Sequence, residues 1–235
     1  IDWNTSYGAQ PQVARTRVPV YLCPSEPRDT LRPAPSASHP EFAHYPLNYG
    51  ANMGEWFIWD PQTGRGGSGV FYPNSHLGLG SLTDGTSHTL AFAEVRAWAP
   101  YLRDGGQPAG PAVPTPLDPA VVAAWGGDFK SESGHTEWVD ARIHQSGFTT
   151  TFAPNTSVPY THDGTLFDID FNASREGKSI TAVTYAAVTA RSGHVGGVGA
   201  ALCDGSVRFV ADTVDLSVWR GLGSRNGGEV VNLQP

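Results

Sequence analysis

The stretch at residues 195–210, VGGVGAALCDGSVRFV, decides how the end of this chain folds. Two apolar runs, 195–203 and 206–210, flank the dipeptide Asp204-Gly205. Asp-Gly between two strand-like runs is a strong signal for a two-residue hairpin turn. We therefore predict a terminal β-hairpin whose tight turn is made by Asp204 and Gly205.

Outward from this hairpin, the chain reads as short strands separated by glycine- and proline-rich loops. A short helix should follow the hairpin, with Asp212 or Asp215 as its cap and Gly221 and Gly223 ending it. The other strands are expected at 18–22, 47–59, 70–72, 89–95, twice within 135–152, at 167–171 and at 181–189. We predict one β-rich α+β domain over 1–235, an antiparallel sheet with long loops, the longest at 103–120.

Composition restricts the classes of partner. The formal charge is −7, and no basic run occurs, so nucleic acid is not an expected partner. No apolar stretch approaches the ~20 residues that a membrane-spanning helix needs. The chain begins at Ile1 with neither an initiator Met nor a signal peptide, so we expect it to be part of a longer or processed product.

The two cysteines, Cys23 and Cys203, are far apart in the sequence. In an exported protein they are candidates for a disulfide, which would close a long loop. The alternative is two buried free thiols that behave as small apolar residues.

His194 and Asp204 could be read as a metal pair or a catalytic dyad. If the nine residues between them form a regular strand, ten steps of ~3.3 Å put the two side chains about 30 Å apart. We therefore expect a structural role for both, with Asp204 in the turn and His194 at the far end of the strand.

A calcium site is a second candidate. Asp168, Asp170 and Asn172 place three oxygen-bearing side chains on one side of a strand, and Asp163 is nearby. The segment lacks the glycine and the terminal acid of an EF-hand loop. The alternative is an exposed strand face whose acidic side chains point to water.

Seven tryptophans raise a third candidate, an aromatic platform for sugars that would include Trp56 and Trp59. The alternative is core packing. A hydrolase would rest only on scattered acids and histidines, because no complete nucleophile or zinc-protease motif occurs. We expect no enzymatic activity, and no cofactor except the candidate calcium ion.

Several short segments follow one another in order along the chain. His194 is followed by nine residues and then Asp204-Gly205. The other segments are CPS (23–25), LTDGTSHT (82–89), GHTEWVD (134–140), FAPNT (152–156), DGSVRFV (204–210), VWRGLG (218–223) and GGEVV (227–231).

This series resembles the DUF1559 family, the H-X9-DG prepilin-type proteins abundant in planctomycetes, although His88 stands where the family usually has Asn. The resemblance covers the chain from about residue 20 to its end. It implies a pilin- or pseudopilin-like domain that follows an N-terminal hydrophobic helix, which these 235 residues do not include.

The implied function is that of a structural subunit of a fibre like a type IV pilus or a type II secretion pseudopilus. The subunit would lie in the cell envelope, periplasmic or extracellular, and would be membrane-anchored through the helix before assembly. The expected partners are other pilin-like subunits. A polysaccharide- or calcium-binding module displayed on such a fibre is the alternative.

Overall fold

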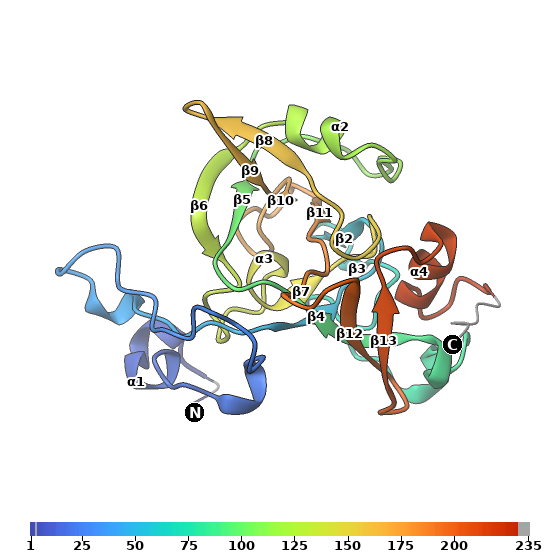
Figure 1. The fold of residues 1–235 in the computed structure, drawn as a ribbon, viewed down its shortest axis with the longest axis horizontal. Coiled ribbons are helices and arrows are strands. Elements are labelled where there is room, and N and C mark those ends of the chain that lie inside the picture. The colour runs from blue at the N-terminus through green and yellow to red at the C-terminus, as the bar shows by residue number, and fades with distance from the viewer. Residues whose placement is uncertain (3, 230–235) are drawn as a thin grey trace.

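Two sheets of unequal size organise the chain in a computed structural model, which describes residues 1–2 and 4–229. The first sheet has five strands in the order β13-β12-β4-β1-β7 (Figure 1). Their bounds are Tyr49–Asn52 (β1), Leu90–Glu94 (β4), Gly147–Phe148 (β7), Gly197–Leu202 (β12) and Val207–Ala211 (β13). All neighbours are antiparallel except β1 and β7, which are parallel.

The second sheet has six strands in the order β3-β2-β11-β10-β5-β6, and a separate hairpin is formed by β8 and β9. The strands of the larger sheet are Phe57–Asp60 (β2), Arg65–Gly66 (β3), Ala99–Arg103 (β5), Asp128–Gly134 (β6), Asp170–Asn172 (β10) and Thr184–Ala187 (β11). The hairpin consists of Pro159–His162 (β8) and Thr165–Asp168 (β9). Strands β5 and β10 are parallel, so both large sheets are mixed.

The described helices are short. They are Pro11–Ala14 (α1), Pro119–Ala124 (α2), Ile143–Ser146 (α3) and Leu216–Gly223 (α4), with 3₁₀ turns at Tyr7–Ala9, Pro19–Tyr21, Pro40–Phe42, Leu79–Ser81 and Thr86–His88. Within the described part of the chain, none of the helices has the length and apolar character needed to cross a membrane. This β-rich α+β architecture agrees with the sequence prediction.

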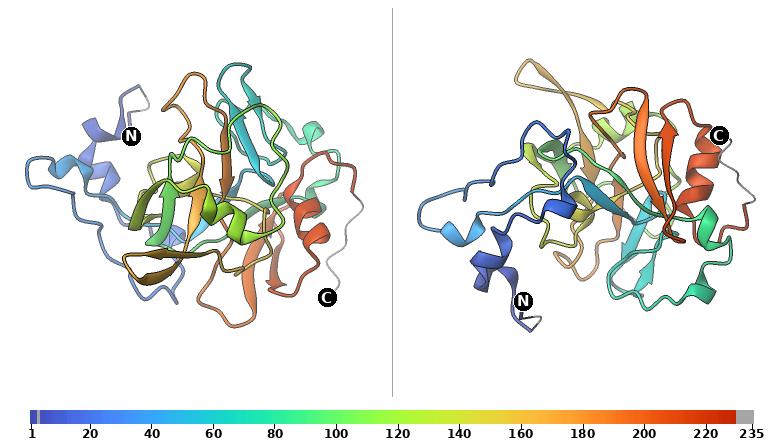
Figure 2. Two further views of the ribbon diagram at one scale, coloured as in Figure 1. Left: turned by 90° about the horizontal axis from the view of Figure 1, so that it is seen from above. Right: turned by 60° about the horizontal axis from the view of Figure 1, so that its bottom comes forward.

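The terminal hairpin and the helix after it form as predicted. Gly205 adopts a φ of 86°, and the Asp204 carboxylate accepts hydrogen bonds from the backbone N–H and the hydroxyl of Ser206. Asp215 rather than Asp212 caps α4, by accepting from the Ser217 N–H at 2.8 Å. In Figures 1 and 2, α4 lies beside the β12–β13 hairpin.

One face of the five-stranded sheet carries most of its buried apolar side chains. Its inner face packs against α4, and the shared core holds Leu90, Ala93, Val198, Ala200, Leu202, Val210, Phe148, Trp219 and Leu222. Alternation along β12 puts its remaining residues on the opposite face. In β4 a register shift opposite Leu202 lets both Leu90 and Ala93 face the core, while Phe92 lies on the opposite face.

The six-stranded sheet packs against α2 and the β8–β9 hairpin around a second core. Trp56 lies at its centre, stacked on Trp125 and Phe171 at centroid distances of 5.4 and 6.2 Å. In Figures 1 and 2, the first part of the chain, in blue, lies to one side of both sheets.

Four strand predictions were wrong or incomplete. The segment at 18–22 is a 3₁₀ turn, because Pro19 lacks the N–H that a ladder needs. Residues 70–72 form no strand. The run at 167–171 is split at Ile169, so β9 and β10 belong to different sheets. Two strands were predicted within 135–152. The structure has only the short β7 in this range, and β6 ends just before it, at Gly134.

Between β5, which ends at Arg103, and α2, which begins at Pro119, the chain forms no helix or strand. The last recognised segment, 227–231, is described only as far as residue 229, so residues 230 and 231 lie outside the described residues.

Candidate metal centre

Three potential ligand atoms from distant parts of the chain meet at one point. The thiol of Cys23 lies 3.5 Å from Nε2 of His194, and the same nitrogen lies 3.2 Å from Oε1 of Glu94. All three ligand atoms lie within 4.8 Å of one another. Glu94 is buried, Cys23 is half-buried and His194 is exposed, so the cluster opens to solvent on the histidine side.

Glu94 is placed by the five-stranded sheet. It is the last residue of β4, and its other oxygen, Oε2, accepts a hydrogen bond from the Gly199 N–H of β12 at 2.6 Å. A Cβ at Gly199 would lie 3.3 Å from Oε2, a tight contact, so the missing side chain leaves room for the carboxylate. This arrangement fixes the carboxylate while Oε1 faces Cys23 and His194.

Cys23 is held by Asn48, the residue before β1. Its backbone N–H donates to Oδ1 of the buried Asn48 at 3.1 Å, and the Asn48 amide donates to Glu26 at 2.7 Å. The Asn48 N–H in turn donates to Tyr21 in the 3₁₀ turn before Cys23. The turn and the asparagine therefore set the position of the thiol against the sheet.

His194 lies in the short connection that leads into β12. Its N–H donates to the Ser192 hydroxyl at 3.1 Å, and that hydroxyl donates to Gly197 at 2.6 Å. Asn155 accepts from the Ser192 N–H and donates to Asp212 at 2.6 Å. The connection is thus tied to the sheet on both sides of the histidine.

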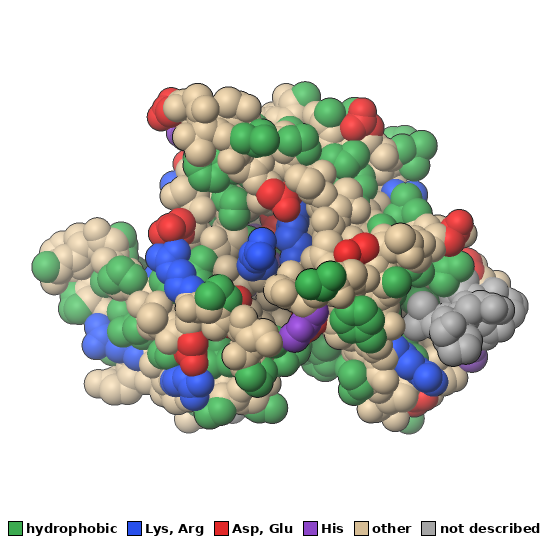
Figure 3. Space-filling model, viewed as in Figure 1, with side chains coloured by type: hydrophobic (Ala, Val, Ile, Leu, Met, Phe, Trp, Pro, Cys, Tyr) green, Lys and Arg blue, Asp and Glu red, His purple; other side chains and the backbone are tan. Residues whose placement is uncertain are grey.

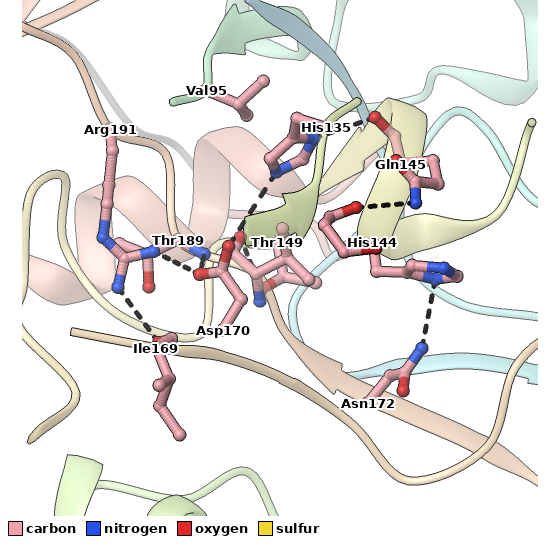
Figure 4. A network of polar contacts seen from close by, with 12 residues as sticks. Val95, His135, His144, Gln145, Thr149, Ile169, Asp170, Asn172, Thr189 and Arg191 are labelled. Carbon is pink, nitrogen blue, oxygen red and sulfur yellow. Dashed lines mark hydrogen bonds and ion pairs between the residues drawn. The ribbon is translucent and has the colours of Figure 1, made fainter. Parts of the chain in front are cut away.

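The residue that begins this connection, Arg191, is part of a buried charge network (Figure 4). Its guanidinium is paired with Asp170 and with Asp168, and its backbone N–H donates to the carbonyl of Glu94 at 2.9 Å. His135 lies 3.9 Å from Asp170 on the other side. Burial lowers the pKa of His135, which favours the neutral imidazole, and the counter-ion of Asp170 is Arg191.

The candidate calcium ligands do not come together, and that prediction needs correction. Asp168 and Asp170 are both paired with Arg191, whereas Asn172 donates to His144 at 3.2 Å. Asp163 lies in the β8–β9 turn with its side chain almost fully exposed. Because β9 and β10 belong to different sheets, Asp168 does not continue the strand face that Asp170 and Asn172 share.

The candidate sugar platform also needs correction. Trp56 is 2 % exposed and lies inside the second core, and the indole nitrogen of Trp59 is buried as well. A side chain that packs on three aromatic neighbours has no face left for a sugar. Core packing accounts for Trp56, and Trp59 is partly buried against a third apolar cluster.

The candidate disulfide is not formed: Cys23 and Cys203 are free thiols. Strand β12 separates them, since Cys23 contacts His194 before the strand and Cys203 follows it. The same strand separates His194 from Asp204. The partners of Asp204 are the N–H and hydroxyl of Ser206, and the carboxylate partner of His194 is Glu94.

Sequence reasoning missed the cluster of Cys23, Glu94 and His194. One signal was present: Glu94 is an acid inside the apolar run at 90–95. A second signal was that the cysteine and the histidine each belong to a recognised segment, CPS and H-X9-DG. Neither signal indicates that Cys23 and His194, which are 171 positions apart, lie next to each other.

A second surface feature borders the cluster. The outward side of the five-stranded sheet carries a mostly apolar groove of about 860 Å³. We call this surface the open face, and its residues are Tyr49, Ala51, Phe92, Gly199, Ala201, Val207 and Phe209. On the side of the molecule seen in Figure 3, by contrast, charged side chains of both signs are interspersed with apolar ones.

Comparison with known proteins gives one match. The model of the family described as "Protein of unknown function (DUF1559)" matches residues 2–217, which confirms the resemblance found from the sequence segments. No curated protein and no solved structure matches the chain.

Proposed function

The chain belongs to the DUF1559 family, and on that premise we propose that it is a non-enzymatic structural subunit of a pilus- or pseudopilus-like fibre of the cell envelope. The single observation that carries the proposal is the open face of the five-stranded sheet. A hydrophobic helix, which the prepilin-type resemblance implies, is the occupant that this face fits.

One complete cross-strand row of the open face is apolar. Ala51 pairs with Phe92, and Ala201 pairs with both Phe92 and Val207, so these four side chains form one row. Directly paired residues share a face of the sheet. Phe92, Val207 and Phe209 are 42, 73 and 59 % exposed.

The shape of this surface favours a helix as its cover. Ala51, Gly199 and Ala201 form a floor without bulky side chains, whereas Phe92 and Phe209 stand higher beside it. A sheet face of this kind is stable when another element buries it, and a helix with an apolar stripe is a common partner. Contiguous exposed apolar surface marks an interaction site in soluble proteins.

In the proposed fibre, the hydrophobic helix of a subunit would lie on the open face and would anchor the subunit in the membrane before assembly. The partners are other pilin-like subunits, and the location is periplasmic or extracellular. The calcium- and polysaccharide-binding alternative is not favoured, because Asp168 and Asp170 are paired with Arg191 and Trp56 lies in the aromatic core.

The test uses the full gene product in cells that produce it. Surface appendages are sheared off, separated from membranes, and labelled with an antibody against this domain in electron micrographs. Phe209→Asp and Val207→Asp place a charge on the open face, and we expect both variants to be absent from fibres. Leu166→Asp is the matched control, since Leu166 is equally exposed, at 70 %, but lies on the β8–β9 hairpin.

Labelled fibres that contain the wild type and the Leu166 variant, but not the open-face variants, are the expected result. The proposal is wrong if the wild type occurs only as a soluble monomer, or if both open-face variants assemble as the wild type does. Purified variants are compared by circular dichroism, so that loss of assembly is separated from loss of folding.

A further inference from the structure

We propose that Cys23, Glu94 and His194 bind a divalent transition-metal ion, with zinc as the ion that their chemistry suits best. The inference is independent of the fibre function, because it rests on the side chains of one folded chain. Its basis is that a thiol, an imidazole nitrogen and a carboxylate oxygen from three separate segments point at one shared position.

The distances between the ligand atoms fit a zinc ion. Zinc binds sulfur at about 2.3 Å and nitrogen or carboxylate oxygen at about 2.0–2.2 Å, so a tetrahedral site separates its ligand atoms by about 3.4–3.6 Å. The separations here are 3.5 Å between Cys23 Sγ and His194 Nε2 and 3.2 Å between His194 Nε2 and Glu94 Oε1. Two of the three separations therefore lie within a few tenths of an ångström of the zinc values, and the third, between Cys23 and Glu94, is no more than 4.8 Å.

The ligand set also separates zinc from the alkaline-earth ions. Calcium and magnesium are bound by oxygen atoms, whereas thiolate and imidazole ligands select zinc and its neighbours among the transition metals. A thiol, an imidazole and one carboxylate provide three ligands. The fourth position faces the solvent side of the cluster, where His194 is 40 % exposed, so a water molecule can complete the coordination.

A catalytic relay of thiol, imidazole and carboxylate is the competing interpretation, and the geometry does not favour it. In such a relay, one ring nitrogen faces the nucleophile and the other faces the acid. Here the same nitrogen, Nε2 of His194, lies next to both the Cys23 thiol and the Glu94 carboxylate. When one ion is bound, the thiol and the carboxylate must both lie close to the same ring nitrogen, as they do here.

The surrounding hydrogen bonds hold each ligand in place. The Gly199 N–H occupies Oε2 of Glu94, so Oε1 is the oxygen directed to the ion. Asn48 fixes the backbone at Cys23, and Ser192 fixes the backbone at His194. Partners of this kind orient metal ligands and raise their affinity. A bound ion would join the N-terminal segment to both β4 and the entrance to β12.

The test is a titration of the reduced, chelator-treated protein with cobalt(II), which reports a bound thiolate through a sulfur-to-cobalt charge-transfer absorption band. Zinc is then added to displace cobalt, and the melting temperature is measured with and without zinc. The variants are Cys23→Ser, His194→Asn and Glu94→Gln. Glu94→Gln preserves the size of the side chain and an oxygen that can accept from Gly199.

Two matched controls distinguish this site from others on the chain. Cys203→Ser removes the other half-buried thiol, and His76→Asn removes another exposed imidazole. We expect one equivalent of cobalt and the charge-transfer band in the wild type and in both controls. We expect no band in Cys23→Ser, and affinity at least about tenfold weaker in His194→Asn and Glu94→Gln.

Absence of the band in the reduced wild type would overturn the proposal, as would a band that persists in Cys23→Ser or disappears in Cys203→Ser. If Cys23→Ser fails to fold, the proposal is tested instead by comparing the zinc-induced rise in melting temperature of the wild type with that of Glu94→Gln. That rise must be present in the wild type and reduced in Glu94→Gln. An equal rise in both would also overturn the proposal.

Discussion

The guanidinium of Arg191 is paired with the carboxylate of Asp170 inside the protein, with side-chain exposures of only 6 and 4 %. The same carboxylate accepts from the Thr189 N–H at 3.1 Å, and the guanidinium donates to the carbonyl of Ile169 at 3.2 Å. This pair connects β10 to the segment that carries His194. It therefore joins the six-stranded sheet to the candidate metal centre.

Removing one partner of this pair should destabilise the fold strongly. Asp170→Ala leaves the buried Arg191 charge without its closest counter-ion, and the loss of a partner from a buried pair costs about 3–5 kcal/mol. Asp168→Ala is the control, because Asp168 is 40 % exposed and its pair contributes at most about 1 kcal/mol. Urea unfolding measures both, and equal losses would contradict the assigned importance of Asp170.

The hairpin requires glycine at position 197 for reasons of space. A Cβ there would overlap the carbonyl oxygen of Val210 on the paired strand. We expect Gly197→Ala to lower the free energy of unfolding by about 1–3 kcal/mol, the usual cost of overpacking. Gly199→Ala should cost less, since its Cβ would press only on the Glu94 side chain. Thermal unfolding followed by circular dichroism tests the order of the two variants.

Glu176 should make stability depend on pH. Burial raises its pKa to about 7, although the Ile143 N–H donates to its Oε1 at 3.0 Å. Between the ordinary value of 4.5 and 7, the folded state keeps a proton that the unfolded state has lost. The contribution of Glu176 to stability therefore falls as the pH rises through this window, by about 3 kcal/mol in total.

Glu176→Gln removes this titration. The variant should match the wild type near pH 4 and exceed its stability above pH 7, where the wild type carries the full cost of a buried carboxylate. Urea unfolding across this pH range gives the difference. A difference between the two proteins that stays constant with pH would show that Glu176 titrates normally.

Trp56 should matter for stability and not for sugar binding. Trp56→Ala opens a cavity among Trp125, Phe171 and Tyr185, and such changes cost about 3–5 kcal/mol. Val20→Ala is a suitable control, because Val20 is 76 % exposed and should contribute little. Calorimetry with polysaccharides should show no heat that depends on Trp56, and a Trp56-dependent binding heat would contradict the packing role.

Local sequence predicted those elements whose determinants are neighbours along the chain. The Asp204-Gly205 turn and the cap at Asp215 depend on contacts within two or three residues, and both formed. The prediction for 18–22 failed because apolar character was given more weight than Pro19. The split of 167–171 at Ile169 depends on which sheet each half joins, and periodicity contains no information about that.

The sequence by itself determined the β-rich fold, the terminal hairpin with its helix, and membership of the family. Only the tertiary structure decided that Asp168 and Asp170 neutralise Arg191, that Trp56 is buried, and that Cys23, Glu94 and His194 meet. The physical reason is the range of the interactions. Turns and caps are set by adjacent residues, whereas an ion pair or a ligand set depends on how separate strands are ordered and registered in the sheets.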